Sequence, residues 1–170
     1  MRSCIPLAVS IVLTGPALAA EVKLNVEIPQ LAVAEYHKPY LAIWIERPGQ
    51  PSLTNLAIWY DLNNAKNEGE KWLKDLRQWW RRSGRELSMP VDGITGTTRA
   101  PGTHPVELND VSKFLGELSP GDYRLVVEAA REVGGREVVQ INFMWLPAAP
   151  EILTATGKSE LARVVLELKP

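Results

Sequence analysis

The sequence is poor in the residues that form the commonest metal and nucleophile sites. It contains one cysteine, Cys4, and two histidines, His37 and His104. The two histidines are far apart in the chain and lack the clustered partners of a zinc or catalytic site. We interpret both as surface residues. A single cysteine also excludes a disulfide within the chain.

An excess of charge of one sign is also missing. The 19 basic and 20 acidic residues give a formal net charge of −1, and the pI is about 6.2. Nucleic acids and anionic membranes are bound through a basic face. The composition therefore argues against a general affinity for either. The 170 residues, of which 45% are apolar, suffice for a single domain with a sizeable core.

The chain offers no unbroken apolar run that suits a membrane span. The longest apolar stretch runs from Ile5 to Leu18, follows the basic Arg2 and is interrupted by Gly15 and two prolines. It ends on the small-x-small pattern at 17–19, which is typical of signal peptide cleavage. We predict a signal peptide over 1–19 and one periplasmic domain over 20–170 that does not span the membrane. Cleavage would remove Cys4, so the core alone would hold the mature protein.

The first part of the mature chain has the patterns of β-strands. Apolar and polar residues alternate over 22–28, which predicts a strand with one wet face at an edge of a sheet. Both faces are apolar over 40–46 and 55–60, which predicts two central strands. A turn rich in proline over 48–51 joins them into a hairpin. Trp44 and Trp59 are expected to be large core residues.

Residues 70–82 are predicted to form one amphipathic helix. Five apolar residues recur there at helical spacing: Trp72, Leu73, Leu76, Trp79 and Trp80. Packing of the tryptophans in the core is the simpler interpretation. The alternative is that Trp79 or Trp80 stacks on a cofactor ring, because the helix leads directly into an unusual loop.

The second half of the chain completes an all-β pattern. The segment 118–123 has a Leu-x-Pro-Gly-x-Tyr shape that resembles the tyrosine corner of β-sandwiches. A strand follows from Tyr123, turns at Gly134-Gly135 and returns over 139–145. A loop containing Pro147, Pro150 and Gly157 is expected before a last strand over 161–168. The fold class predicted is mainly β, an antiparallel immunoglobulin/fibronectin-like β-sandwich of six or seven strands with one amphipathic helix inserted.

The unusual loop, Pro90 to Pro105, is punctuated by glycine and proline. Such residues are common in ordinary surface loops, which is the simpler interpretation. Its Asp-Gly-Ile-Thr-Gly-Thr-Thr segment over 92–98 resembles the Asp-Gly-x-(Ser/Thr)-Gly-Ala-(Thr/Ser) signature at which FAD:protein FMN transferases attach FMN through a phosphoester. The resemblance implies that Thr98 carries the flavin, within a site that also includes Asp92, Gly93, Thr95, Gly96 and Thr97. Thr97 stands where the signature has alanine, so the choice between Thr97 and Thr98 stays open.

Most of the mature chain resembles a family of predicted periplasmic proteins that is known only as a domain of unknown function. The likeness is carried by residues 40–46, 56–60, 72–80, 92–98 and 118–123. It implies association with PepSY-type membrane reductases and FMN transferases, in settings of iron acquisition or extracytosolic electron transfer. Two functions are therefore expected as alternatives. One is a periplasmic electron carrier with covalent FMN, rather than a stand-alone enzyme. The other is a cofactor-free immunoglobulin-like binding or assembly module.

Overall fold

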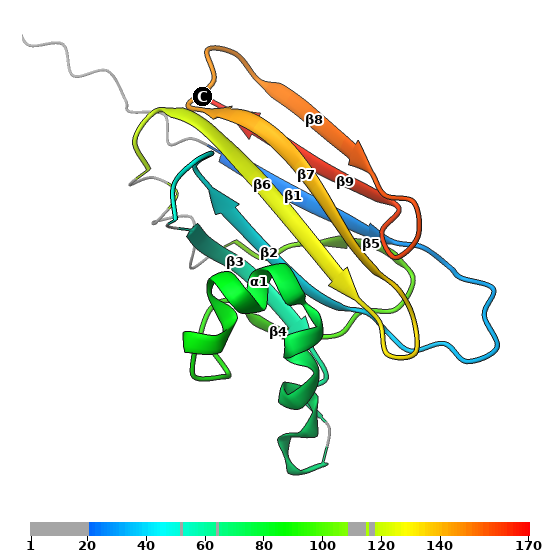
Figure 1. The fold of residues 1–170 in the computed structure, drawn as a ribbon. Coiled ribbons are helices and arrows are strands. Elements are labelled where there is room, and N and C mark those ends of the chain that lie inside the picture. The colour runs from blue at the N-terminus through cyan, green and yellow to red at the C-terminus, as the bar shows by residue number, and fades with distance from the viewer. Residues whose placement is uncertain (1–20, 52, 64, 109–114, 116–117) are drawn as a thin grey trace, which may run out of the picture.

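The computed structural model describes residues 21–170 except positions 52, 64, 109–114 and 116–117. The signal peptide expected over 1–19 lies outside the described residues. The described part contains nine strands in two stacked sheets (Figure 1). The strands are β1 (Glu21–Ile28), β2 (Tyr40–Glu46), β3 (Leu53–Tyr60), β4 (Thr95–Thr97), β5 (Gly102–Pro105), β6 (Gly121–Ala130), β7 (Arg136–Trp145), β8 (Glu151–Thr156) and β9 (Arg163–Lys169).

The two sheets form a β-sandwich, as the sequence predicts. One sheet has the antiparallel order β5-β1-β9-β8, and the other has the order β4-β3-β2-β6-β7. Every neighbouring pair of the second sheet is antiparallel except β3 and β4, which run parallel. Alternate residues of β1, β2, β3, β6, β7 and β9 point between the sheets and form one hydrophobic core. That core includes Leu24 and Val26 of β1, Ile43 of β2, Leu125 of β6 and Val164 of β9.

A second, smaller core lies on the other face of the five-stranded sheet. It is covered by a helical segment made of η1 (Ala65–Asp75), α1 (Arg77–Arg82) and η2 (Gly84–Glu86). Leu73, Leu76 and Trp79 of this segment pack against Trp44 and Ile58 of the sheet. The strands β2, β3 and β6 are thus apolar on both faces because one face meets the opposite sheet and the other meets the helical segment.

The prediction of one continuous helix over 70–82 is wrong in its geometry. The segment is a 3₁₀ helix up to Asp75, breaks at Leu76 and continues as one short α-helix. Leu73 lies in the 3₁₀ part, Leu76 at the break and Trp79 in α1. Their spacing of three keeps all three residues on the face that packs against the sheet.

Glu128 of β6 fastens the helical segment to the sheet. Its side chain is completely buried, and its carboxylate accepts hydrogen bonds from the backbone N–H groups of Gln78 (3.0 Å) and Trp79 (2.7 Å). These two groups belong to the first turn of α1, where backbone N–H groups lack partners within the helix. Arg136 of β7 supplies the opposite charge. The strand thereby provides the cap that Leu76, at the N-cap position, does not provide.

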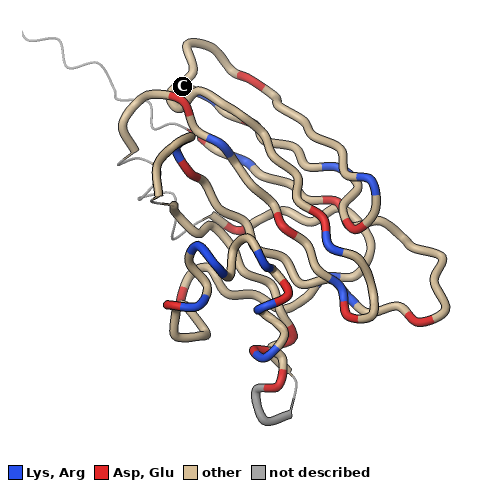
Figure 2. Tube along the Cα trace, in the orientation of Figure 1, with Lys and Arg blue, Asp and Glu red and all other residues tan. Residues whose placement is uncertain are grey.

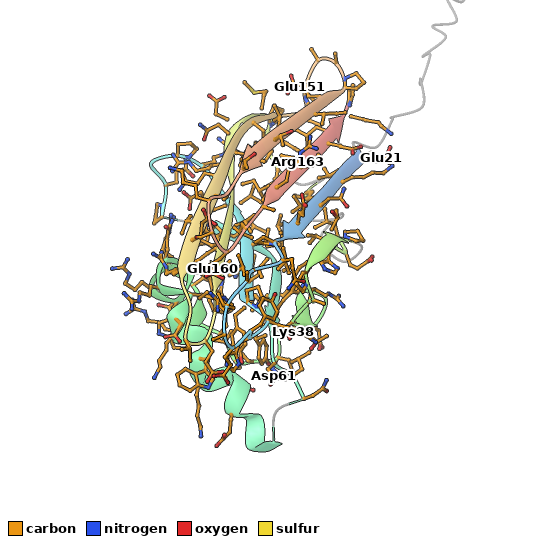
Figure 3. All side chains as sticks on the ribbon, turned by 90° about the vertical axis from the view of Figure 1, so that its right-hand side faces the viewer. Glu21, Lys38, Asp61, Glu151, Glu160 and Arg163 are labelled. Atoms are coloured by element: carbon orange, nitrogen blue, oxygen red, sulfur yellow. The ribbon has the colours of Figure 1, made fainter. Side chains whose placement is uncertain are left out.

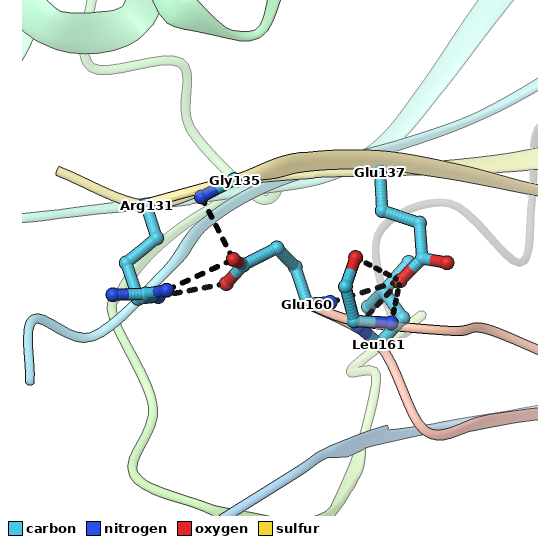
Figure 4. A network of polar contacts seen from close by, with 6 residues as sticks. Arg131, Gly135, Glu137, Glu160 and Leu161 are labelled. Carbon is cyan, nitrogen blue, oxygen red and sulfur yellow. Dashed lines mark hydrogen bonds and ion pairs between the residues drawn. The ribbon is translucent and has the colours of Figure 1, made fainter. Parts of the chain in front are cut away.

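A second polar network joins the two sheets at the β6–β7 hairpin (Figure 4). Glu160, just before β9, accepts two hydrogen bonds from the Arg131 side chain and one from the backbone N–H of Gly135. Glu137 of β7 accepts backbone N–H groups over 158–161. Arg131 and Glu160 are both buried, with 7% and 3% of their side chains exposed. The hairpin is therefore held rigidly against the opposite sheet.

Two local predictions are confirmed. The Tyr123 hydroxyl donates to the carbonyl of Ser119 over 2.9 Å, which is the bond of a tyrosine corner. The hairpin turn at Gly134-Gly135 also forms, and residues 139, 141, 143 and 145 of the returning strand face the core.

Three expectations about strands are wrong. β1 is an interior strand rather than an edge strand, because β5 pairs along its free side. β5 and β4 both lie within the stretch 90–105 that was expected to be a loop, and β8 lies within the expected loop before the last strand. β4, β5 and β8 have three to six residues each, and their side chains are exposed or half-buried. Short edge strands of this kind show little alternation of apolar and polar residues, so the sequence did not predict them.

Replacement of Glu128 tests its role as the anchor of the helical segment. Glu128→Ala leaves Arg136 and two backbone N–H groups without their acceptor in a buried place. We expect a loss of about 3–5 kcal/mol in the free energy of unfolding, measured by chemical denaturation. The exposed Glu151→Ala is the control, with a change within about 0.5 kcal/mol. A loss below about 1 kcal/mol for Glu128→Ala would contradict the role given to this carboxylate.

Glu137 predicts a loss of stability in acid. Burial raises the pKa of its carboxyl, but hydrogen bonds from the backbone N–H groups at 158–161 outweigh burial and hold that pKa below its ordinary value. The stabilisation is fully present above the unfolded pKa of about 4.3 and is lost as the pH falls through the folded pKa. Glu137→Gln should therefore be less stable at neutral pH and should lose less stability below about pH 4. Denaturation at several pH values checks this, and Glu151→Gln should keep the parent profile.

Candidate functional site

Residues 92–98, called the signature segment below, lie at the edge of the five-stranded sheet. β4 lies beside the end of β3, with Gly96 opposite Trp59 and Thr97 opposite Tyr60. The backbone N–H of Thr98 continues the pairing by donating to the carbonyl of Tyr60 over 3.2 Å. The segment is thus a tight turn followed by a short strand, and the sheet fixes the place of its last threonine.

Three residues of the segment have structural duties. Gly93 adopts φ +77°, a left-handed conformation that favours glycine. The Thr95 hydroxyl accepts the backbone N–H of Val91 over 2.8 Å and closes the turn. A Cβ on Gly96 would lie 3.0 Å from Cδ1 of the Trp59 indole, so this position leaves almost no room for a side chain. Asp92 is exposed at the tip of the turn.

Thr97 and Thr98 are both half-buried, but they differ in their surroundings. Thr97 belongs to β4, whereas Thr98 lies just beyond it in the lining of a cleft of about 280 Å³. Within the described part of the chain, neither hydroxyl forms a hydrogen bond to another group. The cleft distinguishes the two candidate acceptors, since only Thr98 lines it.

The cleft beside Thr98 is built from five separate segments of the chain. Besides Thr98, the lining residues are Tyr36, His37 and Lys38 from the approach to β2, Tyr40 from its start, Asp61 just after β3, Trp72 from η1 and Glu132 from the β6–β7 hairpin. Lys38 and Asp61 lie together at the end of the sandwich next to η1, while Glu151 lies towards the other end (Figure 3). The lining therefore combines three aromatic rings with both positive and negative groups.

The polar atoms of this lining are incompletely paired. Among the described residues, the buried hydroxyl of Tyr36 and the buried Nε2 of His37 have no hydrogen-bond partner. His37 Nε2 is 3.1 Å from a Glu35 oxygen, close enough for an ion pair when the ring is protonated, yet the alignment does not make a hydrogen bond. Polar groups without a partner can donate hydrogen bonds to a ligand that has acceptor atoms.

The tyrosines of the lining stay neutral over a wide pH range. Burial raises the pKa of Tyr36, an effect that Arg131 opposes and Glu160 reinforces. Burial also raises the pKa of Tyr40, which a hydrogen bond accepted by its oxygen from the Asp61 backbone partly offsets. Both phenols are therefore available as uncharged rings and hydrogen-bond donors at neutral pH.

The tryptophan beside Thr98 is Trp72, which differs from the sequence expectation. Trp79 is completely buried, packs on Gly84 and donates its indole N–H to Asn55, so the core interpretation is confirmed for it. Trp80 is half-buried against the same core. Trp72, by contrast, is 42% exposed and lines the cleft. In the sequence, Trp72 lies beside the apolar face that Leu73 and Leu76 form, and this position was the signal for its exposure.

Other parts of the described chain offer different surfaces. A hollow of about 920 Å³ is lined by residues of β6, β7, β8 and the turn between β2 and β3, including Arg47 and Tyr123. Lys and Arg are interspersed with Asp and Glu along the described trace (Figure 2). His104 contacts the carbonyl of Ala100 over 2.7 Å, and no described His, Cys, Asp or Glu residues cluster in threes or more as a metal site would need. Among the described helices, none has the length and apolar character of a membrane span.

Comparison with known proteins identifies the chain at the level of the family. Neither the curated proteins nor the solved structures gave a match. The model of the family described as "Predicted periplasmic protein (DUF2271)" matches residues 21–163, which include strands β1 to β8, the helical segment and the cleft beside Thr98. This agrees with the periplasmic location expected from the sequence. The chain therefore belongs to the DUF2271 family of predicted periplasmic proteins.

Proposed function

We propose that this protein is a periplasmic electron carrier with FMN attached covalently to Thr98. An FAD:protein FMN transferase would attach the cofactor. The attached flavin would then carry electrons between a PepSY-type membrane reductase and an extracytosolic acceptor, with a link to iron acquisition. The flavin supplies the redox chemistry, and the protein supplies its position and surroundings.

The observation that carries the proposal is the place of Thr98. The last hydroxyl of the signature lies in the wall of a cleft that also contains Tyr36, Tyr40 and Trp72. Aromatic side chains with a few polar groups are typical of sites for planar cofactors. The Tyr36 hydroxyl, which has no hydrogen-bond partner among the described residues, and the ammonium of Lys38 fit a ligand with an anionic phosphate and a polar ring.

The attachment is a phosphoryl transfer that balances without an oxidant. The Thr98 oxygen attacks the phosphorus of the FMN half of FAD, a new P–O ester bond forms, the pyrophosphate bond breaks and AMP leaves. The hydroxyl proton passes to a base of the transferase. Such a displacement requires the attacking and leaving oxygens to be nearly in line. The exposed tip at Asp92 and Gly93 and the free edge of β4 would let the transferase reach the segment.

Covalent attachment suits a protein outside the cytoplasm. A cofactor that dissociates there is lost, whereas a tether keeps it at high effective concentration near its partners. The sandwich contributes a rigid base for this tether, because Thr98 follows a strand that is paired to β3. Electron transfer would then depend on the docking of the cleft end of the protein to each partner in turn.

The acceptor is tested by removal of one hydroxyl. Thr98→Val keeps the β-branched shape and deletes the nucleophile, so it should fold and be exported without a flavin. Thr97→Val is the matched control, since it removes the neighbouring hydroxyl from β4 and should still be flavinylated. Each variant is produced together with the transferase, and intact mass shows whether the FMN adduct is present.

Two results would change the proposal. An adduct that persists on Thr98→Val and disappears from Thr97→Val would move the site to Thr97. A parent protein without any adduct would remove the electron-carrier proposal. Thr95 is a poor control because its hydroxyl holds the turn through Val91, so Thr95→Val should disturb loop geometry as well.

The second candidate function is a cofactor-free binding or assembly module of the periplasm. The observation in its favour is the hollow of about 920 Å³ lined by β6, β7 and β8, towards the end of the sandwich away from Lys38 and Asp61 (Figure 3). Colour separates the two functions. Protein made in a host with a competent transferase should be yellow, with flavin that survives denaturation and precipitation, whereas colourless protein would favour the binding module.

A further inference from the structure

Trp72 is a large apolar side chain that is exposed, although apolar residues near it in the chain are buried. It is 42% exposed, although Leu73 beside it and Leu76 one turn later are buried in the second core. Burial of the leucines directs the indole to the flank of η1 rather than into the sheet. Lys74 approaches the face of the ring, with its ammonium 5.8 Å from the ring centroid. The protein thus presents an indole to solvent next to a cation.

Two clefts meet at this indole. The cleft of about 280 Å³ contains Thr98, and a second cleft of about 430 Å³ contains Arg77 and the tip of the β6–β7 hairpin. Trp72 and Glu132 line both. The two clefts are therefore neighbours, and Trp72 forms part of the wall between them. A ligand that extends from Thr98 along this surface must pass the indole.

We infer that Trp72 is the stacking platform for the flavin ring of the cofactor attached at Thr98. This inference rests on the proposed function. The phosphate would be held at Thr98, and the tricyclic ring would lie against the indole, where the two clefts meet. Planar aromatic rings gain from offset stacking, and the exposed apolar face of Trp72 would be covered by this contact. The neighbouring arm of the second cleft leaves space for the ring to extend beyond the Thr98 cleft.

The rigidity of the surroundings supports the same assignment. η1 continues into α1, whose first turn is fastened by Glu128, and Glu132 follows Arg131, which is locked to Glu160. Both walls next to Trp72 are therefore anchored to buried carboxylates. A platform for an electron carrier needs such fixed geometry, because side chains that are held in place position a group better than mobile ones.

The other indoles are poorer partners for the ring. Trp44, Trp79 and Trp145 are each exposed by 2% or less. Trp59 is nearer to the signature segment, but Gly96 and the Arg99 guanidinium cover its ring. Trp80 packs on the second core and lines neither of the two clefts. Trp72 alone, among the described tryptophans, combines exposure with a place beside Thr98.

The experiment compares flavin fluorescence in matched variants. The parent, Trp72→Phe and Trp80→Phe are each produced with the transferase, and intact mass confirms the FMN adduct on all three. An indole in contact with the ring quenches flavin emission, whereas phenylalanine does not. We expect several-fold brighter emission per flavin in Trp72→Phe than in the parent, and no change in Trp80→Phe. Far-ultraviolet circular dichroism checks that each variant is folded.

The possible results separate the two proposals. An adduct on the parent with equal emission from the parent and Trp72→Phe would overturn the platform role and leave the proposed function intact. An adduct that is missing from the parent would overturn the proposed function itself. If Trp72→Phe fails to fold, the parent still decides the question: its flavin should brighten on unfolding in guanidinium chloride, and equal brightness in both states would overturn the inference.

Discussion

The buried carboxylate of Glu128 is the constraint on which the site end of the molecule depends. A charge in a completely buried place is tolerated only when it is fully paired, and here Arg136 and two backbone N–H groups provide the pairing. The same bonds fix where α1 begins. They thereby set the position of η1 before it and of the chain that leads through Gly84 to the signature segment. The helical segment is held by Glu128, by the ion pair of Arg82 with the buried Glu46 of β2 and by a small apolar core, rather than by its own helix propensity.

The cleft beside Thr98 follows from this anchoring and from a second one. The β6–β7 hairpin would be an exposed, glycine-rich tip, but Arg131 and Glu160 clamp it to the opposite sheet. Glu132 follows directly on the clamped arginine and faces the cleft from that side. On the other side, β3 and β4 place Thr98 through their parallel pairing. The cleft thus lies between elements that buried polar contacts immobilise, and it is lined by side chains from the loops that connect them.

The sequence predicted the parts of the fold that depend on strong hydrophobic patterns. The strands β1, β2, β3, β6, β7 and β9, the hairpin turn and the tyrosine corner all follow from periodicity or local turn chemistry. The short edge strands could not be predicted, because β4 and β8 take their geometry from neighbours rather than from their own side chains. The 3₁₀ geometry of η1 was missed for a related reason. The spacing of Leu73, Leu76 and Trp79 is compatible with both helix types, and only contact with the sheet selects one.

The signature segment contains positions that the fold explains and one, Thr98, that it does not explain. Gly93, Thr95 and Gly96 are explained by the fold itself, since they set a turn, close it and make room for Trp59. A loop with only a structural role would need these three residues, whereas its other positions could hold many residue types. Thr98 has no such duty for its side chain within the described residues, yet it lies in an aromatic cleft with incompletely paired polar atoms. The sequence could not have brought Tyr36, Trp72 and Glu132 to that threonine, because they come from segments that only the tertiary fold assembles. The case for a cofactor therefore rests less on the motif than on the surroundings in which its last residue lies.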